Sequence, residues 1–249
     1  MIPVSVAIVT KDEEKNIREA IQSIKDFAEI VIVDAFSADR TLDICREYTE
    51  KIHQAEWKGY AKQKQMAIEH AKGPWVFILD SDERFTESLR EEITHMVKNN
   101  GVYSGFYVPR KNFFLGKWMR HGGWWPDYTL RLFLKDKASM KDREVHEKVV
   151  VNGTVGYLKN PIEHYTYRTI SDYIKKMENY STLSANELCN KKVTPSIFSM
   201  LINPGFVFLK MFFLRQGFRD GIHGFILSVL YSFYTFLKYT KVWERKAKR

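Results

Sequence analysis

Two carboxylates stand one residue apart in the segment Asp80-Ser81-Asp82, directly after the apolar run 75–79. At the end of a buried strand, two such side chains can share a divalent cation. Mg²⁺ and Mn²⁺ prefer oxygen ligands, which carboxylates and diphosphates supply. The spacing therefore predicts a metal site that binds a nucleotide diphosphate, although in an exposed loop the same residues would be no more than solvated charges.

The first hundred residues alternate apolar runs with amphipathic stretches, which indicates an α/β fold. Expected strands cover residues 4–9, 29–34 and 75–79, and expected helices cover 13–24, 37–48, 58–71 and 87–98. Strands that are apolar throughout and separated by helices predict a parallel sheet covered on both faces. Ligands bind such sheets beyond the carboxyl ends of the strands. Polar residues follow three of these ends, at Thr10, Asp34 and Asp80.

The pattern changes after residue 101. Strands are expected at 106–109, 129–134 and 149–158, a loop rich in Gly and Trp at 113–127, and a polar helix at 169–189. Two very apolar segments then occupy most of 195–243. We predict one domain over 1–168, made of two halves (1–100 and 101–168), followed by a helical region over 169–249.

Charge is distributed unevenly along the chain. Residues 1–100 contain 14 Lys/Arg and 19 Asp/Glu, whereas the rest contains 25 and 11, so the net charges are −5 and +14. The basic part requires an anionic partner. The two cysteines, Cys45 and Cys189, have no metal-ligand spacing and are expected to be reduced thiols.

Several blocks resemble family 2 glycosyltransferases. Residues 5–17 are similar to the opening of that family, 32–41 to its second block, and 62–67 to the basic stretch before the Asp-x-Asp strand. Residues 127–133, 145–147 and 208–224 resemble the branch that contains lipopolysaccharide-core β-glucosyltransferases. The resemblance implies a GT-A fold, a Rossmann-like and mostly parallel sheet flanked by helices, here with an apolar helical appendage at the C-terminus. It makes 1–168 the catalytic domain, with a nucleotide-sugar half over 1–100 and an acceptor half over 101–168, and 169–249 the membrane-associating region.

The resemblance also implies roles on the donor side. Thr10 and Glu13 would lie near the nucleotide base, and Asp34 would contact the base or ribose unless it only caps a helix. Ala35 stands where the family usually has a second Asp. Lys62 would approach the diphosphate, or it is a solvated helix charge.

Transfer to a hydroxyl group requires a general base within hydrogen-bond reach of that hydroxyl. Glu147 is the first candidate and Asp127 the second. His146 would orient the base or the acceptor, although a structural role is equally open. Glu147 could instead pair with a neighbouring cation such as Lys148.

Three further features bear on the predicted crevice. Arg131 is a charged residue in a strand that alternates polar and apolar positions. It is expected to point into the crevice and to bind phosphate through two guanidinium nitrogens. The resemblance makes His164 a candidate metal ligand, with a buried structural role as the alternative. The tryptophans of the 113–127 loop could stack on sugars or anchor the loop.

The C-terminal apolar segments are flanked by Lys and Arg. Residues 222–237 carry no charge, but they are shorter than the roughly 20 residues that span a bilayer. We therefore expect an interfacial hairpin on an anionic membrane rather than a transmembrane pair. A helical cap on the catalytic domain is the alternative. The expected location is the cytoplasmic face of the inner membrane, as a peripheral or monotopic protein.

Together these features predict a metal-dependent, inverting glycosyltransferase. It would use Mg²⁺ or Mn²⁺ and a nucleotide-sugar donor of the UDP type, and would act on a lipid-linked or lipopolysaccharide-core acceptor. A sugar-phosphate nucleotidyltransferase of similar fold is disfavoured, because residues 10–14 are acidic rather than glycine-rich and basic. A non-catalytic binder of nucleic acid or membrane would have no use for the acidic strand ends, and we expect no nucleic-acid partner.

Overall fold

The computed structural model describes residues 1–99, 101–141 and 148–247. The chain divides into two compact units. Met1–Arg110 and Tyr128–His164 make the first unit, and Lys111–Asp127 and Tyr165–Arg249 make the second. The sequence-based boundary after residue 168 differs from this division, because the Trp-rich loop groups with the C-terminal helices.

The N-terminal half of the first unit is a parallel sheet. Its strands lie in the order β3-β2-β1-β4. They are β1 (Ile2–Thr10), β2 (Phe27–Asp34), β3 (Ile52–Gln54) and β4 (Trp75–Asp80). The accompanying helices are α1 (Ile17–Gln22), α2 (Thr41–Arg46), α3 (Tyr60–His70) and α4 (Glu87–Lys98). This arrangement confirms the predicted α/β class.

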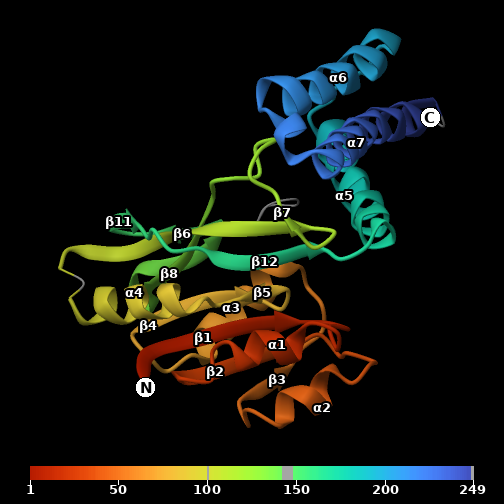
Figure 1. Ribbon diagram of the computed structural model, residues 1–249. Helices are drawn as coiled ribbons and strands as arrows, with labels where there is room; N and C mark the ends of the chain where they lie inside the picture. The colour runs from red at the N-terminus through yellow and green to blue at the C-terminus, as the bar shows by residue number, and fades with distance from the viewer. Residues whose placement is uncertain (100, 142–147, 248–249) are drawn as a thin grey trace. The chain divides into compact units, whose positions relative to one another are not determined.

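The sheet continues beyond β4 with strands from later in the chain, as Figure 1 shows. β8 (Asp127–Leu134) pairs antiparallel with β4, and the order continues through β6 (Tyr103–Phe114), β12 (Ile162–Tyr167) and β5 (Glu83–Arg84). β7 (Lys117–Trp118) and β11 (Thr154–Tyr157) pair with β6. After a short 3₁₀ turn (Lys135–Lys137), β9 (Ala138–Lys141) and β10 (Lys148–Val151) form a separate antiparallel pair.

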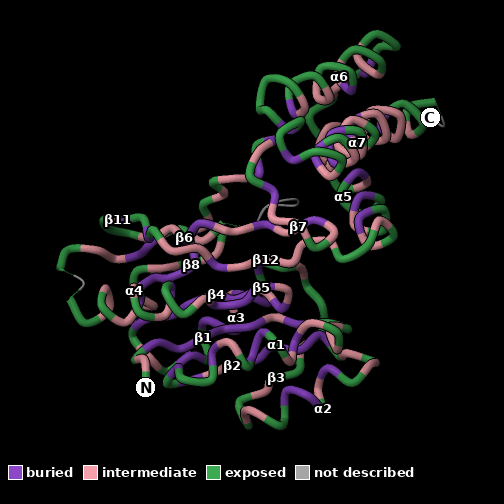
Figure 2. The backbone as a smooth tube through the Cα atoms, viewed as in Figure 1, coloured by how far each residue is buried: buried purple, intermediate pink, exposed green. Residues whose placement is uncertain are grey.

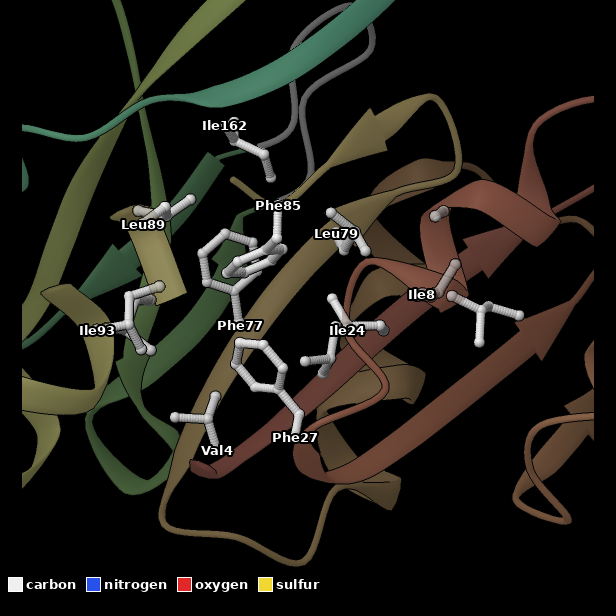
Figure 3. Packing of buried hydrophobic residues seen from close by; sticks show 14 of the residues in the cluster. Val4, Ile8, Ile24, Phe27, Phe77, Leu79, Phe85, Leu89, Ile93 and Ile162 are labelled. Carbon is white, nitrogen blue, oxygen red and sulfur yellow. The ribbon is translucent and has the colours of Figure 1, made fainter. Parts of the chain in front are cut away.

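Both faces of β1 are buried, which explains its unbroken apolar sequence. Val6 and Ile8 belong to a core that includes residues of α1 and α4, whereas Ala7 packs in a second cluster with residues of α3. In the first core, shown in Figure 3, the ring of Phe85 lies 4.9 Å from that of Phe27 and 4.6 Å from that of Phe77. Figure 2 shows the same buried strands in purple. Packing on both faces makes the sheet a rigid platform.

The predicted helix limits are confirmed to different degrees. α4 has the predicted bounds, because Thr86 caps it by accepting the backbone N–H of Leu89. The helix expected from residue 13 begins instead at Ile17. Asp12 has a φ of 54°, and the N–H groups of Asn16 and Ile17 bond to the Glu13 carbonyl in a turn.

The second unit contains the C-terminal helices. They are α5 (Ile170–Asn190), α6 (Ile197–Leu209), which continues as a π-helical turn (Lys210–Leu214), and α7 (Ile222–Ala247). A 3₁₀ turn (Gly217–Asp220) precedes α7. A Cβ atom on Gly224 would lie 1.9 Å from the Gly217 carbonyl oxygen, so this approach requires glycine. Met211 and Leu227 pack in one buried cluster with Trp124, Tyr173 and Met177.

Much of α6 is exposed, as its colouring in Figure 2 indicates. Within the described part of the chain, Ile197–Leu214 is the one helical stretch that is long and apolar enough to cross a membrane, and 11% of it is buried. Length and composition alone support this assignment. The charge-free stretch 222–237 that the sequence singled out lies inside α7.

Candidate active site

Three polar residues meet at the carboxyl edge of the parallel sheet. In the strand register, Thr10 pairs with Asp34, and Val9 of the same strand pairs with Asp80. The strands run in the same direction, so their C-terminal ends lie together. The structure thus brings together the strand ends that the sequence indicated.

Thr10 and Asp34 are both buried at this edge. The carboxylate of Asp34 accepts the backbone N–H of Ser37 at 2.9 Å and the Ser37 hydroxyl at 2.5 Å. It therefore shapes the turn after β2, and this turn-forming role resembles the capping alternative. The Thr10 hydroxyl oxygen is buried without a hydrogen-bond partner, an arrangement that is uncommon in folded proteins.

The loop after β1 is tied to the loop after β2. The backbone N–H of Glu13 donates to the Thr41 hydroxyl at 2.8 Å, and that of Glu14 donates to Asp39 at 3.1 Å. The Glu13 carboxylate accepts the Asn16 side-chain amide at 2.7 Å. Glu13 is thus held beside the strand ends by backbone and side-chain bonds.

Asp80 lies at the centre of a charged cluster. Its two carboxylate oxygens contact Lys64 Nζ at 2.9 Å and Arg131 Nη2 at 2.5 Å. Burial by itself would raise the pKa of Asp80, but the charges of Arg131 and Lys64 hold that pKa well below its usual range. Asp80 is therefore ionised at neutral pH.

Arg131 also reaches Glu83, a residue that the sequence analysis did not single out. Arg131 Nη2 lies 2.6 Å from Glu83 Oε1, and Glu83 Oε2 accepts the backbone N–H of Asp80 at 3.0 Å. The Glu83 side chain is fully buried. Burial opposes the charge on Arg131, but Asp80 and Glu83 outweigh that effect and raise its pKa. The Arg131 side chain reaches the strand end and links the two acids, and its binding of phosphate stays a prediction.

Lys64, rather than Lys62, is the α3 lysine beside Asp80. The Lys64 side chain is 10% exposed, whereas Lys62 lies on the exposed side of α3. The two are only two residues apart, and side chains two positions apart on a helix face different directions. The helical phase, set by the buried Ala61, Ala67 and Ile68, was the signal that could have identified Lys64.

Asp82 and His164 form a second pair close to the first. His164 Nε2 lies 3.4 Å from Asp82 Oδ1, and the two side chains are 12% and 15% exposed. The antiparallel pairing of β12 with β5, in which His164 is the register partner of Glu83, brings this histidine to the Asp80–Asp82 segment. The structure thereby brings together the predicted ligands Asp82 and His164. The carboxylate of Asp80, in contrast, is paired with Lys64 and Arg131.

The chemistry of this pair is compatible with a divalent cation whose remaining ligands are diphosphate oxygens. One carboxylate and one imidazole suit Mn²⁺ better than Mg²⁺, which favours oxygen ligands. In the described ranges, no group of three or more His, Cys, Asp or Glu side chains is arranged to hold a metal ion.

The candidate residues for removal of the acceptor proton are Glu147, Asp127 and His146. Glu147 and His146 lie outside the described residues. Asp127 belongs to the second unit, where its carboxylate accepts the side-chain amide of Asn112 at 2.9 Å. Their assignment as catalytic residues stays a prediction.

The chain is similar in sequence to known glycosyltransferases over nearly its whole length. Residues 5–166 match the family described as Glycosyl transferase family 2. The chain is 30% identical over 258 residues to the lipopolysaccharide core biosynthesis glycosyltransferase LpsC of Rhizobium meliloti, covering 99% of this chain and 94% of that protein. An uncharacterized glycosyltransferase of Rickettsia typhi, RT0209, is also 30% identical, over 260 residues, with coverage of 100% and 89%.

A solved structure supports the fold. The mannosyltransferase PcManGT of Pyrobaculum calidifontis, in complex with GDP-Man and Mn²⁺, superposes with a TM-score of 0.55 at 13% identity, over 96% of this chain and 86% of that one. This superposition confirms the expected fold, and the similarity to LpsC confirms the resemblance to lipopolysaccharide-core enzymes. With the Asp-x-Asp segment at the end of β4 and a family match over most of its length, the chain belongs to glycosyltransferase family 2.

Proposed function

We propose that this glycosyltransferase moves a sugar, with inversion, from a nucleotide-sugar donor to a lipid-linked or lipopolysaccharide-core acceptor. The observation that carries the proposal is the Asp80–Asp82 segment at the edge of the sheet, where Lys64, Arg131 and His164 converge on it. The similarity to LpsC supports an acceptor of the cell envelope.

The donor side follows from the strand ends. Thr10, Glu13 and Asp34 form the edge at which the nucleoside would bind, and the Thr10 hydroxyl oxygen there is buried without a hydrogen-bond partner. Lys64 would attract the diphosphate, with Lys62 as an outer contact on the same helix. Asp80, ionised and held between two cations, would accept donor hydroxyl groups.

Asp82 and His164 would hold a divalent cation, for which Mn²⁺ fits the mixed oxygen and nitrogen pair better than Mg²⁺. PcManGT was solved with Mn²⁺ and GDP-Man, which supports testing this ion first. When bound, the cation neutralises the charge of the departing diphosphate.

Removal of the acceptor proton would be the task of Glu147, with Asp127 as the second candidate and His146 as an orienting group. One base and one displacement give inversion at the anomeric carbon. Exchange of each acid for its amide separates the two, because only the base should show a loss of kcat with the donor KM preserved.

Release of nucleoside diphosphate tests the activity. The protein is incubated with UDP-sugars and GDP-sugars in the presence of Mn²⁺, with and without cell-envelope glycolipid. Asp82→Asn should abolish Mn²⁺-dependent release, while Asp136→Asn, which changes an exposed acid, should leave it intact. Absence of release and of nucleotide binding by the native protein would refute the proposal.

We also propose that the second unit binds an anionic membrane at the cytoplasmic face of the inner membrane. Large apolar side chains along α6 and the following π turn are more than half exposed. They are Ile197, Phe198, Leu201, Ile202, Phe206, Leu209, Phe213 and Leu214. Full burial of one such side chain contributes about 1.5–3 kcal/mol. Arg215 and Arg219, which follow this helix, are exposed and suit anionic headgroups.

Sedimentation with lipid vesicles tests this contact. Phe198→Ser combined with Leu201→Ser should release the protein from vesicles of phosphatidylglycerol and phosphatidylcholine, whereas Tyr157→Ser, which alters an exposed aromatic residue of the first unit, should not. Binding that survives the double substitution would assign the membrane contact to another surface.

A further inference from the structure

A cavity of about 380 Å³ lies beside Asp80 within the first unit. Its walls come from the Asp80 end of β4, from β6, β8 and β10, and from Lys64 of α3. The volume is within the range of small-molecule sites, about 300–1,000 Å³. Asp80 and Lys64, which the proposed function assigns to the donor, form one side of the cavity, so a molecule bound in it would adjoin the donor.

Cations outnumber acids among the described residues that line this cavity. Among the described residues that line it, the cations are Lys64, Arg110, Arg131 and Lys148, and the acid is Asp80. Asp80 already contacts Lys64 and Arg131. Arg110 of β6 and Lys148 of β10 are the two other cations of the lining.

The β9–β10 pair adds a second sign of an anion site. Lys148 and Lys141 are direct register partners on these antiparallel strands, and both are exposed. Like charges directly opposite each other destabilise such a pair. A bound anion would relieve the repulsion between these two lysines.

Two tyrosines give the cavity an aromatic wall. Tyr107 stacks on the ring of Tyr157 at 4.9 Å, and Tyr128 meets the same ring edge-on at 5.1 Å. Shared contact with Tyr157 restrains both side chains. Aromatic rings combine an apolar surface with a polar hydroxyl group, which suits the face of a sugar ring.

We infer that this cavity is the acceptor subsite and that it selects an acceptor sugar carrying an anionic group, a phosphate or a carboxylate. Arg110 and Lys148 bind the anion, and Tyr107 and Tyr128 contact the ring. The inference rests on the proposed function for its link to transfer, but the binding that it requires is measured independently of activity.

Calorimetric titration of the full-length protein tests the binding. The probes are glucose 6-phosphate, glucuronate, glucose and inorganic phosphate. At least one anionic sugar should bind about tenfold or more tightly than both glucose and inorganic phosphate. Glucose lacks the charge-assisted bonds of the anion, and inorganic phosphate lacks the ring that contacts the two tyrosines. A preference for glucose 6-phosphate or for glucuronate identifies the anion. Equal binding of glucose, or of inorganic phosphate, overturns the inference.

Substitutions then locate the site. Arg110→Gln and Lys148→Gln should each weaken the binding of the preferred sugar about tenfold, and Tyr128→Leu should weaken it by a smaller factor. Lys159→Gln, an exposed lysine outside the cavity, is the matched control and should bind as the native protein does. Circular dichroism verifies the fold of each variant. Native-like binding by both charge variants overturns the inference.

Failure of the two proposals can be told apart. If the native protein binds an anionic sugar in the cavity but never releases nucleoside diphosphate, the proposed function fails and the subsite stands as a binding site. If it transfers sugar, and Arg110→Gln and Lys148→Gln leave the acceptor KM as in the native enzyme, the transferase stands and the subsite assignment fails.

Discussion

Arg131 offers a test of how the charged cluster contributes to stability. It contacts Asp80 and Glu83, and its side chain is 4% exposed. Arg131→Met keeps the length and apolar stem of the side chain but removes the cation that faces the fully buried carboxyl group of Glu83. Breaking a buried ion pair in this way costs about 3–5 kcal/mol, so we expect the free energy of unfolding to fall by about that amount.

A double variant separates the charge from the packing. In Arg131→Met with Glu83→Gln a neutral amide replaces the buried carboxyl group, and the amide oxygen can still accept the backbone N–H of Asp80. A buried neutral group without a partner costs about 1–3 kcal/mol, so the double variant should be more stable than Arg131→Met. Sugar transfer should stay impaired, because Asp80 has lost its guanidinium partner.

Urea unfolding, followed by circular dichroism and by tryptophan fluorescence, measures these differences, provided that both signals give the same transition. Arg46→Met is the control, since Arg46 pairs with Asp43 in an exposed position, where an ion pair contributes at most about 1 kcal/mol. A loss below about 1 kcal/mol for Arg131→Met, or a double variant less stable than the single one, would refute this account.

Three further predictions follow from other contacts. Lys64→Met should lower kcat/KM for the donor at least about tenfold, whereas Lys62→Met should change it by less, because Lys64 contacts Asp80 and Lys62 lies on the exposed side of α3; equal effects in donor kinetics would count against this assignment. Glu29 is buried, which alone would raise its pKa, but its bonds to Lys51, Ser5 and Lys72 lower that pKa to about 2. Its stabilisation, about 3 kcal/mol, is therefore present above about pH 4.5 and lost toward pH 2, and Glu29→Gln should flatten the dependence of unfolding free energy on pH over that range. Phe77→Ala should cost about 3–5 kcal/mol in urea unfolding, since Phe77 is fully buried in the first core; a cost near zero would mean that the core collapses around the gap.

The sequence by itself determined the strand ends and the acids on them. A buried strand needs an unbroken apolar run, so residues 75–79 predicted β4 and put Asp80 directly at its end. The limits of α4 were equally local, because a cap and the helical period define them. The family blocks added roles for Thr10, Glu13 and Asp34.

Only the tertiary structure decided which partners these acids have. Arg131 reaches Asp80 because β8 pairs antiparallel with β4, and His164 reaches Asp82 because β12 pairs with β5. Such pairings join residues far apart in the sequence, and a local periodicity carries no information about them. The buried Glu83 follows the Asp-x-Asp segment directly and looks like one more exposed charge. Its role depends on the removal of water by packing, which becomes visible only when the chain is folded.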